Sequence, residues 1–388
     1  MMTKTGLKTL GLAGVEELYQ NKGQRAKELA QEGRKVIGYF CCYVPLELFT
    51  ALDIVPYRIH GGTTEPITEA DAYLETIMCP FIRSAFDLAL KNRYDFLDGL
   101  VIPHTCDTVE RLYDIWTYYR EPVYSHFINV PHMLHASSFE FFKKELETYR
   151  KSLEDFAGKK VSDEALTEAV KLHNENRALV RELYSFGKPD PPLAFRSEIL
   201  KTMIVGLGLP VEDFNDLLRS VIQEIKDRNE GPEKKAARVL IYGSVVDEVG
   251  FVQLVEESGA NVVMDDLSTG SRAFWEDVEV TPDPLDGISN RYLDKIHCPR
   301  TYRPQGETPE QDLENRFGHI YRFVKDFNAN AVVLYVIRFC DTYELDAPDF
   351  IDYMDSKDVP VLYLEDEYSA TTLGQLKTRV QAFLEMFD

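Results

Sequence analysis

Six cysteines are the residues of this chain whose type and spacing point most directly to chemistry. Two stand side by side in GYFCCYVPLE, two belong to Cys-Pro dipeptides, and two follow apolar runs. A thiolate can act as a nucleophile, as a redox group or as a metal ligand. The six candidates for such chemistry are Cys41, Cys42, Cys79, Cys106, Cys298 and Cys340.

A disulfide is a poor explanation for the adjacent pair. A bridge between sequence neighbours closes a small, strained ring that is far from relaxed disulfide geometry. Residues 1–20 contain no secretory signal, and no run of about 18 apolar residues indicates a membrane span. We therefore expect a cytoplasmic protein, in which thiols stay reduced.

Eight short runs rich in Val, Ile, Tyr and Phe must supply the strands that position the cysteines. Near-continuous apolar runs indicate strands buried on both faces, and their alternation with helix-like segments indicates parallel sheets. We predict an α/β fold with two doubly wound parallel-sheet domains of the Rossmann or flavodoxin type. The runs cover residues 35–40, 54–60, 96–103, 122–131, 237–244, 260–268, 330–339 and 359–366.

The middle of the chain has helical periodicity instead. Segments such as FEFFKKELETYRKSLEDF and VEDFNDLLRSVIQEIKDR are amphipathic, and Ser162 is a good N-cap for the helix that follows it. We predict an N-terminal α/β domain over residues 1–137, a helical segment over 138–235 and a C-terminal α/β domain over 236–388. The first domain carries four of the cysteines and the last carries two.

On this fold the cysteines lie at strand ends and helix starts. Four follow predicted strands, whose carboxyl ends form the functional edge of parallel sheets. One precedes a proline at an expected helix start, where the helix dipole favours a thiolate, and one lies in a loop. A lone cysteine is most often a packing residue, but this joint placement indicates a thiolate-bound metal centre. The cysteines that follow predicted strands are Cys41, Cys42, Cys106 and Cys340. The cysteine before a proline is Cys79, and the cysteine in a loop is Cys298.

The spacing bears on the metal. Structural zinc usually draws on close pairs such as CxxC, whereas these cysteines are scattered from position 41 to position 340. Thiolates from distant loops of two domains suit an iron-sulfur cluster in a shared cleft. Zinc remains the alternative.

Composition restricts the class of ligand. The chain has 43 basic and 65 acidic residues, a formal net charge of -22. Binding to nucleic acid or to an anionic membrane depends on clustered Lys and Arg, so we expect neither partner. A small-molecule substrate or a protein partner fits this charge better.

An ordered set of motifs resembles one enzyme superfamily over nearly the whole chain. The set is GYFxxYVPLEL, a Cys-Pro before a helix, DGLVIPHTCD, RVLIYGSVVD, ESGANVVMDDLSTGSR, VIRFCD, VPVLYLEDEY and GQLKTRVQAFLE. It is similar to the 2-hydroxyacyl-CoA dehydratase and benzoyl-CoA reductase superfamily. The resemblance implies a [4Fe-4S] cluster bound in each subunit by three cysteines, which by motif are Cys79, Cys106 and Cys340.

The resemblance also implies a protein partner. In this superfamily a separate activator, a dimeric iron-sulfur ATPase with its own [4Fe-4S] cluster, couples ATP hydrolysis to electron transfer. The present sequence contains no GxxxxGK[ST] loop. ATP hydrolysis by the partner is therefore the expectation.

Three further cysteines depart from the dehydratase pattern. Cys41, Cys42 and Cys298 are left over, and six is twice three. The chain is most similar to the double-cubane cluster protein branch, in which six cysteines hold an [8Fe-9S] cluster in a homodimeric reductase. The resemblance implies that all six cysteines bind metal and that the adjacent pair serves the second cubane. Which cysteine binds which cubane stays open.

Charged residues near the cysteines are candidates for proton transfer. Glu47, His104 and Arg338 are the catalytic candidates, and Asp107 and Asp341 also flank cysteines. The alternative role for each is a hydrogen bond or salt bridge beside the cluster. The turn STGSR at 268–272 resembles an anion-binding turn, which alone is weak support for phosphate binding.

Three functions stay open. The first is an activator-coupled, ATP-dependent reductase of a small molecule with a double cubane. The second is a catalytic subunit of a 2-hydroxyacyl-CoA dehydratase or benzoyl-CoA reductase with one [4Fe-4S] cluster, an unlike partner subunit and an acyl-CoA cleft. The third is a noncatalytic maturation or electron-carrier protein. The six cysteines favour the first.

Overall fold

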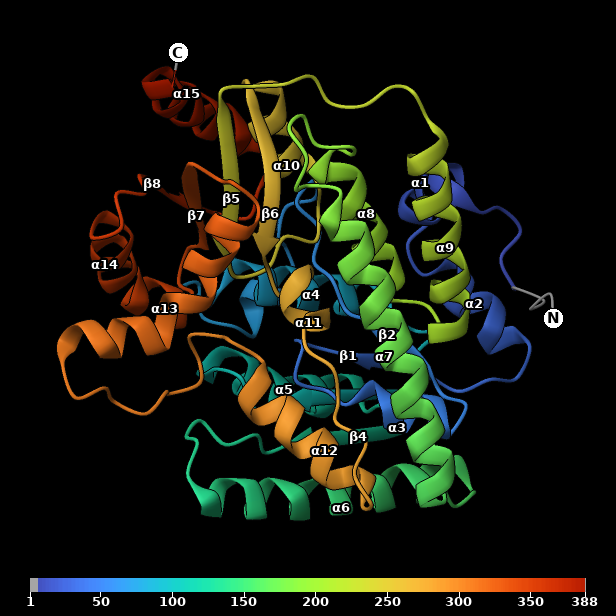
Figure 1. Cartoon of the computed structure of the whole chain (residues 1–388). Helices are drawn as coiled ribbons and strands as arrows, with labels where there is room; N and C mark the ends of the chain where they lie inside the picture. Colours follow the sequence, from blue (N-terminus) through green and yellow to red (C-terminus); the bar gives the residue numbers. More distant parts are fainter. Residues whose placement is uncertain (1–5, 388) are drawn as a thin grey trace.

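Two four-stranded parallel sheets, one from each end of the chain, form the framework of the computed structural model, which describes residues 6–387 (Figure 1). Residues 1–5 and 388, which include the start of the segment searched for a secretory signal, lie outside that description. The strand orders are β2-β1-β3-β4 and β6-β5-β7-β8. The strands are β1 (Val36–Tyr39), β2 (Val55–Arg58), β3 (Gly99–Pro103), β4 (Tyr124–Ile128), β5 (Ala237–Gly243), β6 (Ala260–Asp266), β7 (Ala331–Ile337) and β8 (Val361–Asp366).

The two sheets repeat one topology, so the predicted fold class is confirmed. Each of the eight predicted runs contains one strand, shorter than the run by a few residues at its ends. The inner strands β1, β3, β5 and β7 are buried along their whole length, whereas the edge strands β4 and β8 are partly exposed. Burial on both faces explains why the sequence of the inner strands is apolar without alternation.

Helices flank both sheets. In the first half they are α1 (Gly11–Gln20), α2 (Gln24–Gln31), α3 (Leu46–Ala51), η1 (Ala70–Ala72), α4 (Pro80–Leu90) and α5 (Asp107–Arg120). In the second half they are α10 (Gly250–Glu257), α11 (Ser271–Phe274), α12 (Pro284–Asn290), η2 (Arg291–Lys295), α13 (Pro309–Asp326), α14 (Asp341–Asp355), η3 (Ala370–Thr372), α15 (Leu373–Leu384) and η4 (Glu385–Phe387). Across residues 6–387, no helix combines the length and the apolar character needed to cross a membrane.

Four long helices lie between the sheets in sequence and join them in space. They are α6 (Ala136–Ala157), α7 (Asp163–Ser185), α8 (Arg196–Gly206) and α9 (Val211–Asp227). Ser162 caps α7 as predicted, because its Oγ accepts a hydrogen bond from the backbone N–H of Ala165 at 3.2 Å. Helix α7 packs on α3 of the first half and on α11 and α12 of the second, and Figure 1 shows it running between the two sheets. The division at residues 137 and 235 remains a proposal.

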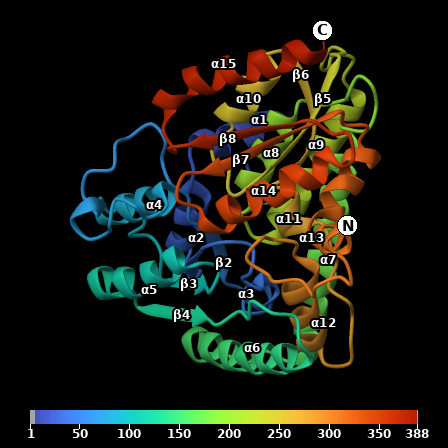
Figure 2. The ribbon, with the colours of Figure 1, turned by 90° about the vertical axis from the view of Figure 1, so that its left-hand side faces the viewer.

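Hydrophobic clusters that contain residues of both halves join the two halves. Figure 2 shows the sheets one above the other, with α15 covering the upper one and α6 the lower one. Tyr368 of the second half packs edge-to-face on Phe81 of the first, with ring centroids 5.7 Å apart. Asp247 accepts hydrogen bonds from the hydroxyl of Tyr368 at 2.6 Å and from the N–H of Gly61 at 2.9 Å. Contacts of this kind fix the relative position of the loops at the sheet edges.

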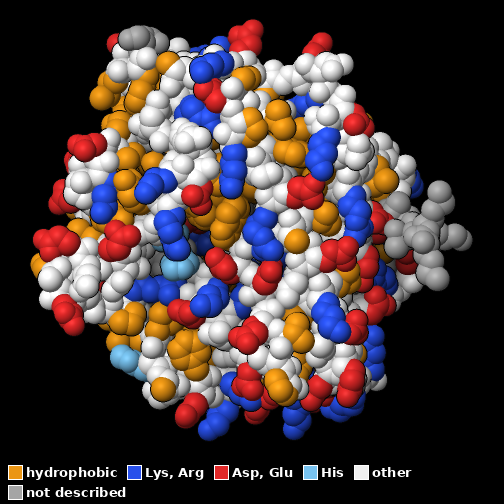
Figure 3. All heavy atoms as spheres, in the orientation of Figure 1, with side chains coloured by type: hydrophobic (Ala, Val, Ile, Leu, Met, Phe, Trp, Pro, Cys, Tyr) orange, Lys and Arg blue, Asp and Glu red, His pale blue; other side chains and the backbone are white. Residues whose placement is uncertain are grey.

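Charges of both signs are mixed on the face of the molecule that Figure 3 shows, where Lys and Arg side chains lie among Asp and Glu side chains. Exposed ion pairs contribute to this mixture. One of them joins α9 to α7, with Nζ of Lys226 at 2.6 Å from Oε1 of Glu182. A mixed face of this kind differs from the clustered Lys and Arg on which binding to nucleic acid depends.

Candidate metal centre

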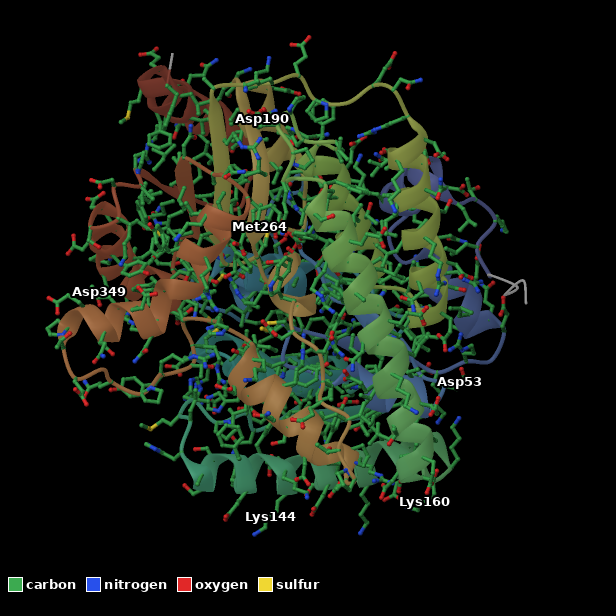
Figure 4. The ribbon with its side chains drawn as sticks, viewed as in Figure 1. Asp53, Lys144, Lys160, Asp190, Met264 and Asp349 are labelled. Atoms are coloured by element: carbon green, nitrogen blue, oxygen red, sulfur yellow. The ribbon has the colours of Figure 1, made fainter. Side chains whose placement is uncertain are left out.

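A cavity of about 110 Å³ lies between the two halves, and cysteines from both halves line it. The sixth cysteine, Cys42, is buried, and its Sγ lies 4.0 Å from the Sγ of Cys41. All six are free thiols. Figure 4 draws the described side chains of the whole molecule as sticks, with Met264 labelled on β6. The five cysteines that line the cavity are Cys41, Cys79, Cys106, Cys298 and Cys340.

Three of these thiols occupy the same local position. Cys79, Cys106 and Cys340 are each the residue immediately before a helix, namely α4, α5 and α14. The N–H groups of a first helical turn have no partner within the helix, and the helix dipole stabilises negative charge there. Pro80 is the first residue of α4, as its sequence predicts. These helix starts are suited to holding thiolates.

Two backbone positions at the cavity are strained, one in each half of the molecule. Cys41 lies two residues after β1 and has φ +57°, and Phe339 lies two residues after β7 and has φ +63°. A left-handed conformation costs a residue with a side chain about 1–2 kcal/mol. Strain of this kind clusters at functional sites, where it fixes the direction of a side chain. In this protein the left-handed conformations hold the backbone in place at Cys41 and at Phe339, the residue before Cys340.

Most of the thiols are held neutral when no metal is bound. Burial raises the pKa of Cys79 and of Cys106 to about 12, and it also raises the pKa of Cys298 and of Cys340. The exception is Cys41, whose pKa is lowered by its hydrogen bond with Cys42 and by nearby arginines. A metal centre here would therefore displace protons as it forms.

The arrangement of the thiols bears on the kind of metal centre. Across residues 6–387, no group of three or more His, Cys, Asp and Glu side chains is arranged to hold one metal ion. Thiols from five separate loops around one cavity are the donor set that an iron-sulfur cluster requires, because such clusters are ligated by cysteine thiolates at several corners.

Three arginines also line the cavity, and of these only Arg272, in the STGSR turn, belongs to a motif singled out in the sequence. Arg58 is the last residue of β2, Arg272 belongs to the STGSR turn, and Arg300 lies two residues after Cys298. Their closeness to cysteines or strand ends was the available signal.

The STGSR turn binds a carboxylate of the chain itself. The backbone N–H of Ser271 donates to Oδ1 of Asp265 at 3.1 Å, and the Ser271 hydroxyl donates to the Asp265 carbonyl oxygen at 2.6 Å. The next residue, Arg272, pairs with Asp266 at 3.0 Å. The anion-binding character of the motif is therefore satisfied internally.

Glu47, one of the catalytic candidates, lies in a buried ion pair. It accepts hydrogen bonds from Nη2 of Arg177 at 2.5 Å and from the hydroxyl of Tyr292 at 2.9 Å. Burial alone would raise the pKa of Glu47, but the charge of Arg177, followed by that of His173, lowers it to about 2. A carboxylate held ionised in this way fits the salt-bridge alternative better than a proton donor.

His104 and Arg338 lie beside the cysteines and are engaged by neighbours. Nδ1 of His104 lies 3.2 Å from the Asn129 side-chain oxygen, and its Nε2 lies 3.4 Å from Glu110. Arg338 is half exposed and pairs with Glu367 at 2.6 Å. Of the flanking acids, Asp107 is the first residue of α5, and the exposed Asp341 lines the cavity.

The comparison with known proteins defines the class to which this chain belongs. Residues 41–387 match the family model of the 2-hydroxyglutaryl-CoA dehydratase D-component, and the chain belongs to that family. It is similar to a subunit of benzoyl-CoA reductase from Thauera aromatica, with 28% identity over 94% of both chains. It is 23% identical to the (R)-phenyllactyl-CoA dehydratase beta subunit of Clostridium sporogenes, over 92% of this chain and 93% of the relative.

A third relative, the beta subunit of (R)-2-hydroxyglutaryl-CoA dehydratase from Acidaminococcus fermentans, is 23% identical over 94% of this chain and 95% of its own. These names describe subunits of one reductase and two dehydratases. The superfamily resemblance predicted from the motifs is confirmed.

Proposed function

We propose that this chain is an iron-sulfur reductase that reduces a small molecule at an [8Fe-9S] double cubane. The observation that carries the proposal is the convergence of all six cysteines, five around one cavity and the sixth adjacent to Cys41. Three thiols would suffice for a single cubane, so the other three need an explanation. A second cubane is the explanation that uses every thiol.

In this proposal the cysteines of both halves hold the cluster, which supplies electrons to the bound substrate. The helix starts at α4, α5 and α14 stabilise negative charge on three of the thiolates. The apolar side chains of Phe40, Phe81 and Ile337 line the same cavity and exclude water from it. The chain itself therefore supplies ligation, burial and an electrostatic environment that sets the potential.

The proposal includes partners. Electrons come from an ATP-hydrolysing [4Fe-4S] activator protein, because the chain has no phosphate-binding loop of the GxxxxGK[ST] type. The working unit is a homodimer in the cytoplasm, because a chain that carries a complete set of ligands needs no unlike subunit.

One specific observation favours a second candidate. Cys79, Cys106 and Cys340 share the position before a helix, which the other three cysteines do not, and three cysteines are the set expected for one [4Fe-4S] cluster. The relatives described above are subunits of acyl-CoA enzymes by name. A catalytic subunit of a 2-hydroxyacyl-CoA dehydratase or benzoyl-CoA reductase is therefore the alternative.

Reduction by the activator tests the proposed function. The anaerobically purified chain is mixed with activator, reductant and ATP, and its visible iron-sulfur absorbance is followed. We expect the absorbance to bleach only when all three are present, with no second subunit added. Bleaching that requires an unlike subunit, together with tight binding of a 2-hydroxyacyl-CoA thioester, would favour the acyl-CoA enzyme. Colourless protein with bound zinc would contradict both candidates.

A further inference from the structure

Arg58 is a buried guanidinium without a carboxylate partner among the residues that the structure describes. It ends β2, lines the cysteine cavity and is 8% exposed. Its Nε and Nη1 atoms are buried and receive no hydrogen-bond partner. Its guanidinium carbon lies 5.7 Å from the centre of the Tyr39 ring, a cation–π contact that helps to hold it in place. The fold thus keeps a positive charge at the cavity wall.

The other two arginines of the cavity differ from Arg58 in their partners. Arg272 forms a buried ion pair with Asp266 at 3.0 Å. Arg300 is 4% exposed and donates to backbone carbonyl oxygens, including those of Pro131 and Val130 at 2.8 Å each, but its Nε is left without a partner. Carbonyl oxygens satisfy donors without neutralising the charge. Arg300 is therefore a second guanidinium without a carboxylate partner among the described residues.

The cavity lining places no carboxylate against Arg58 or Arg300, whose charges instead help to lower the pKa of the Cys41 thiol. Of its described residues, the exposed Asp341 is the one carboxylate, and no ion pair joins it to Arg58 or to Arg300. The hydroxyl of Ser244, another lining residue, is also buried without a partner. An unpaired charge removed from water is costly, and proteins keep one where a bound group of opposite charge compensates it. The arrangement is that of a site for an anion.

We propose that Arg58, assisted by Arg300, compensates the negative charge of a thiolate-ligated iron-sulfur cluster in this cavity and raises its reduction potential. This inference rests on the proposed function, because the anion is the cluster held by the six cysteines. Adding an electron makes such a cluster more negative. A fixed positive charge at the wall stabilises the reduced form more than the oxidised form, so the cluster accepts the electron at a higher potential.

The experiment compares Arg58→Gln, which removes the charge, with Arg58→Lys, which keeps it. The matched control is Arg228→Gln, which removes one arginine charge at a partly exposed pair with Glu198, outside the cavity. Iron per chain and the midpoint potential of the loaded full chain are measured for each by anaerobic titration. At a fixed potential, Arg58→Gln should lower the ratio of reduced to oxidised cluster about tenfold, which corresponds to about 59 mV for one electron. Arg58→Lys and Arg228→Gln should stay near the wild type.

The outcomes separate this inference from the function on which it rests. If the wild type contains no iron, that result would contradict the proposed function itself. Iron-loaded Arg58→Gln with the potential of the control would overturn the inference and leave the function intact. Loss of iron from Arg58→Gln but not from Arg58→Lys would support charge compensation, and loss from both would overturn it.

Folding is checked on the iron-free chains. Because Arg58 has no carboxylate partner, and because the Cys41 thiol on which its charge acts is protonated below about pH 6, iron-free Arg58→Gln should unfold below that pH at a temperature close to that of the iron-free wild type. A lower unfolding temperature for this variant would show that Arg58 has a structural partner and would contradict the inference.

Discussion

Oε1 of Glu47 lies 2.5 Å from Nη2 of Arg177, in an ion pair whose side chains are 0% and 4% exposed. The pair joins α3 of the first half to α7, and Tyr292 of η2 in the second half donates to the other carboxylate oxygen at 2.9 Å. One carboxylate therefore connects all three parts of the chain, five residues after the adjacent cysteines. These contacts indicate that Glu47 has a structural role, in which it holds the parts of the chain around the site together.

Replacing Glu47 by Gln should destabilise the protein by about 3–5 kcal/mol, because removal of one partner leaves the charge of Arg177 buried and uncompensated. Denaturant unfolding measures this change. The control is Glu175→Gln, which removes the carboxylate of the exposed pair between Glu175 and Arg219 and should cost about 0–1 kcal/mol. Equal effects in the two variants would contradict the assigned role of Glu47.

The Glu47 pair should also give the stability a specific pH dependence. The pKa of Glu47 is about 2 in the folded protein, against 4.5 as its ordinary value. Its contribution to stability is therefore complete above about pH 4.5 and is lost as the pH falls toward 2. The difference in unfolding free energy between wild type and Glu47→Gln should be constant above pH 5 and shrink below pH 4.5. A difference that grows on acidification would contradict this pKa.

Glu256 should give a pH dependence of the opposite sign. Its carboxylate accepts hydrogen bonds from the N–H of Arg196 at 2.6 Å and from the hydroxyl of Ser197 at 2.6 Å, at the start of α8. Burial raises its pKa to about 7. Its contribution to stability is therefore full below about pH 4.5 and is lost as the pH rises through 7.

Glu256→Gln should remove this loss of stability between pH 4.5 and 7, as measured by denaturant unfolding across that range. The neighbouring exposed Glu257→Gln is the matched control and should leave the slope unchanged. An unaltered slope in Glu256→Gln would contradict the raised pKa.

Much of the fold was predictable because its inner strands are buried on both faces. The apolar runs around Val36–Tyr39 and Ala331–Ile337 show this burial directly in the sequence. In the helical middle of the chain, the N-cap at Ser162 is a local signal for the start of a helix. The short helices α11 and α12 were not predicted. They are only 4 and 7 residues long, and their position depends on packing against α7, which no local pattern encodes.

The candidate site was predictable where chemistry is tied to local position. Cys79 before Pro80 and Cys340 after β7 follow from the sequence because helix starts and strand ends have local signals. Arg58 and Arg300 were missed because the lack of a carboxylate partner is defined by distant neighbours. The partner of Glu47 could not be read from the sequence for the same reason, since Arg177 lies 130 positions away in the sequence.

Light scattering under anaerobic conditions should give the mass of a dimer, about twice 44.5 kDa. The reason is that one chain carries every proposed ligand of the cluster, so association with an unlike subunit is not required for activity. A stable monomer, or solubility only in the presence of a second gene product, would count against the homodimer.

The central claim is that all six cysteines ligate metal, and iron per chain measured in the wild type and in Cys42→Ser tests it most directly. If every thiol is a ligand of an [8Fe-9S] cluster, anaerobically loaded wild type should contain about eight irons per chain, the number in that cluster. Cys42→Ser should then fall toward four or lose the centre, because its sulfur is the near neighbour of Cys41. A count near four in both proteins would contradict the double cubane and leave the single-cluster acyl-CoA enzyme as the better account.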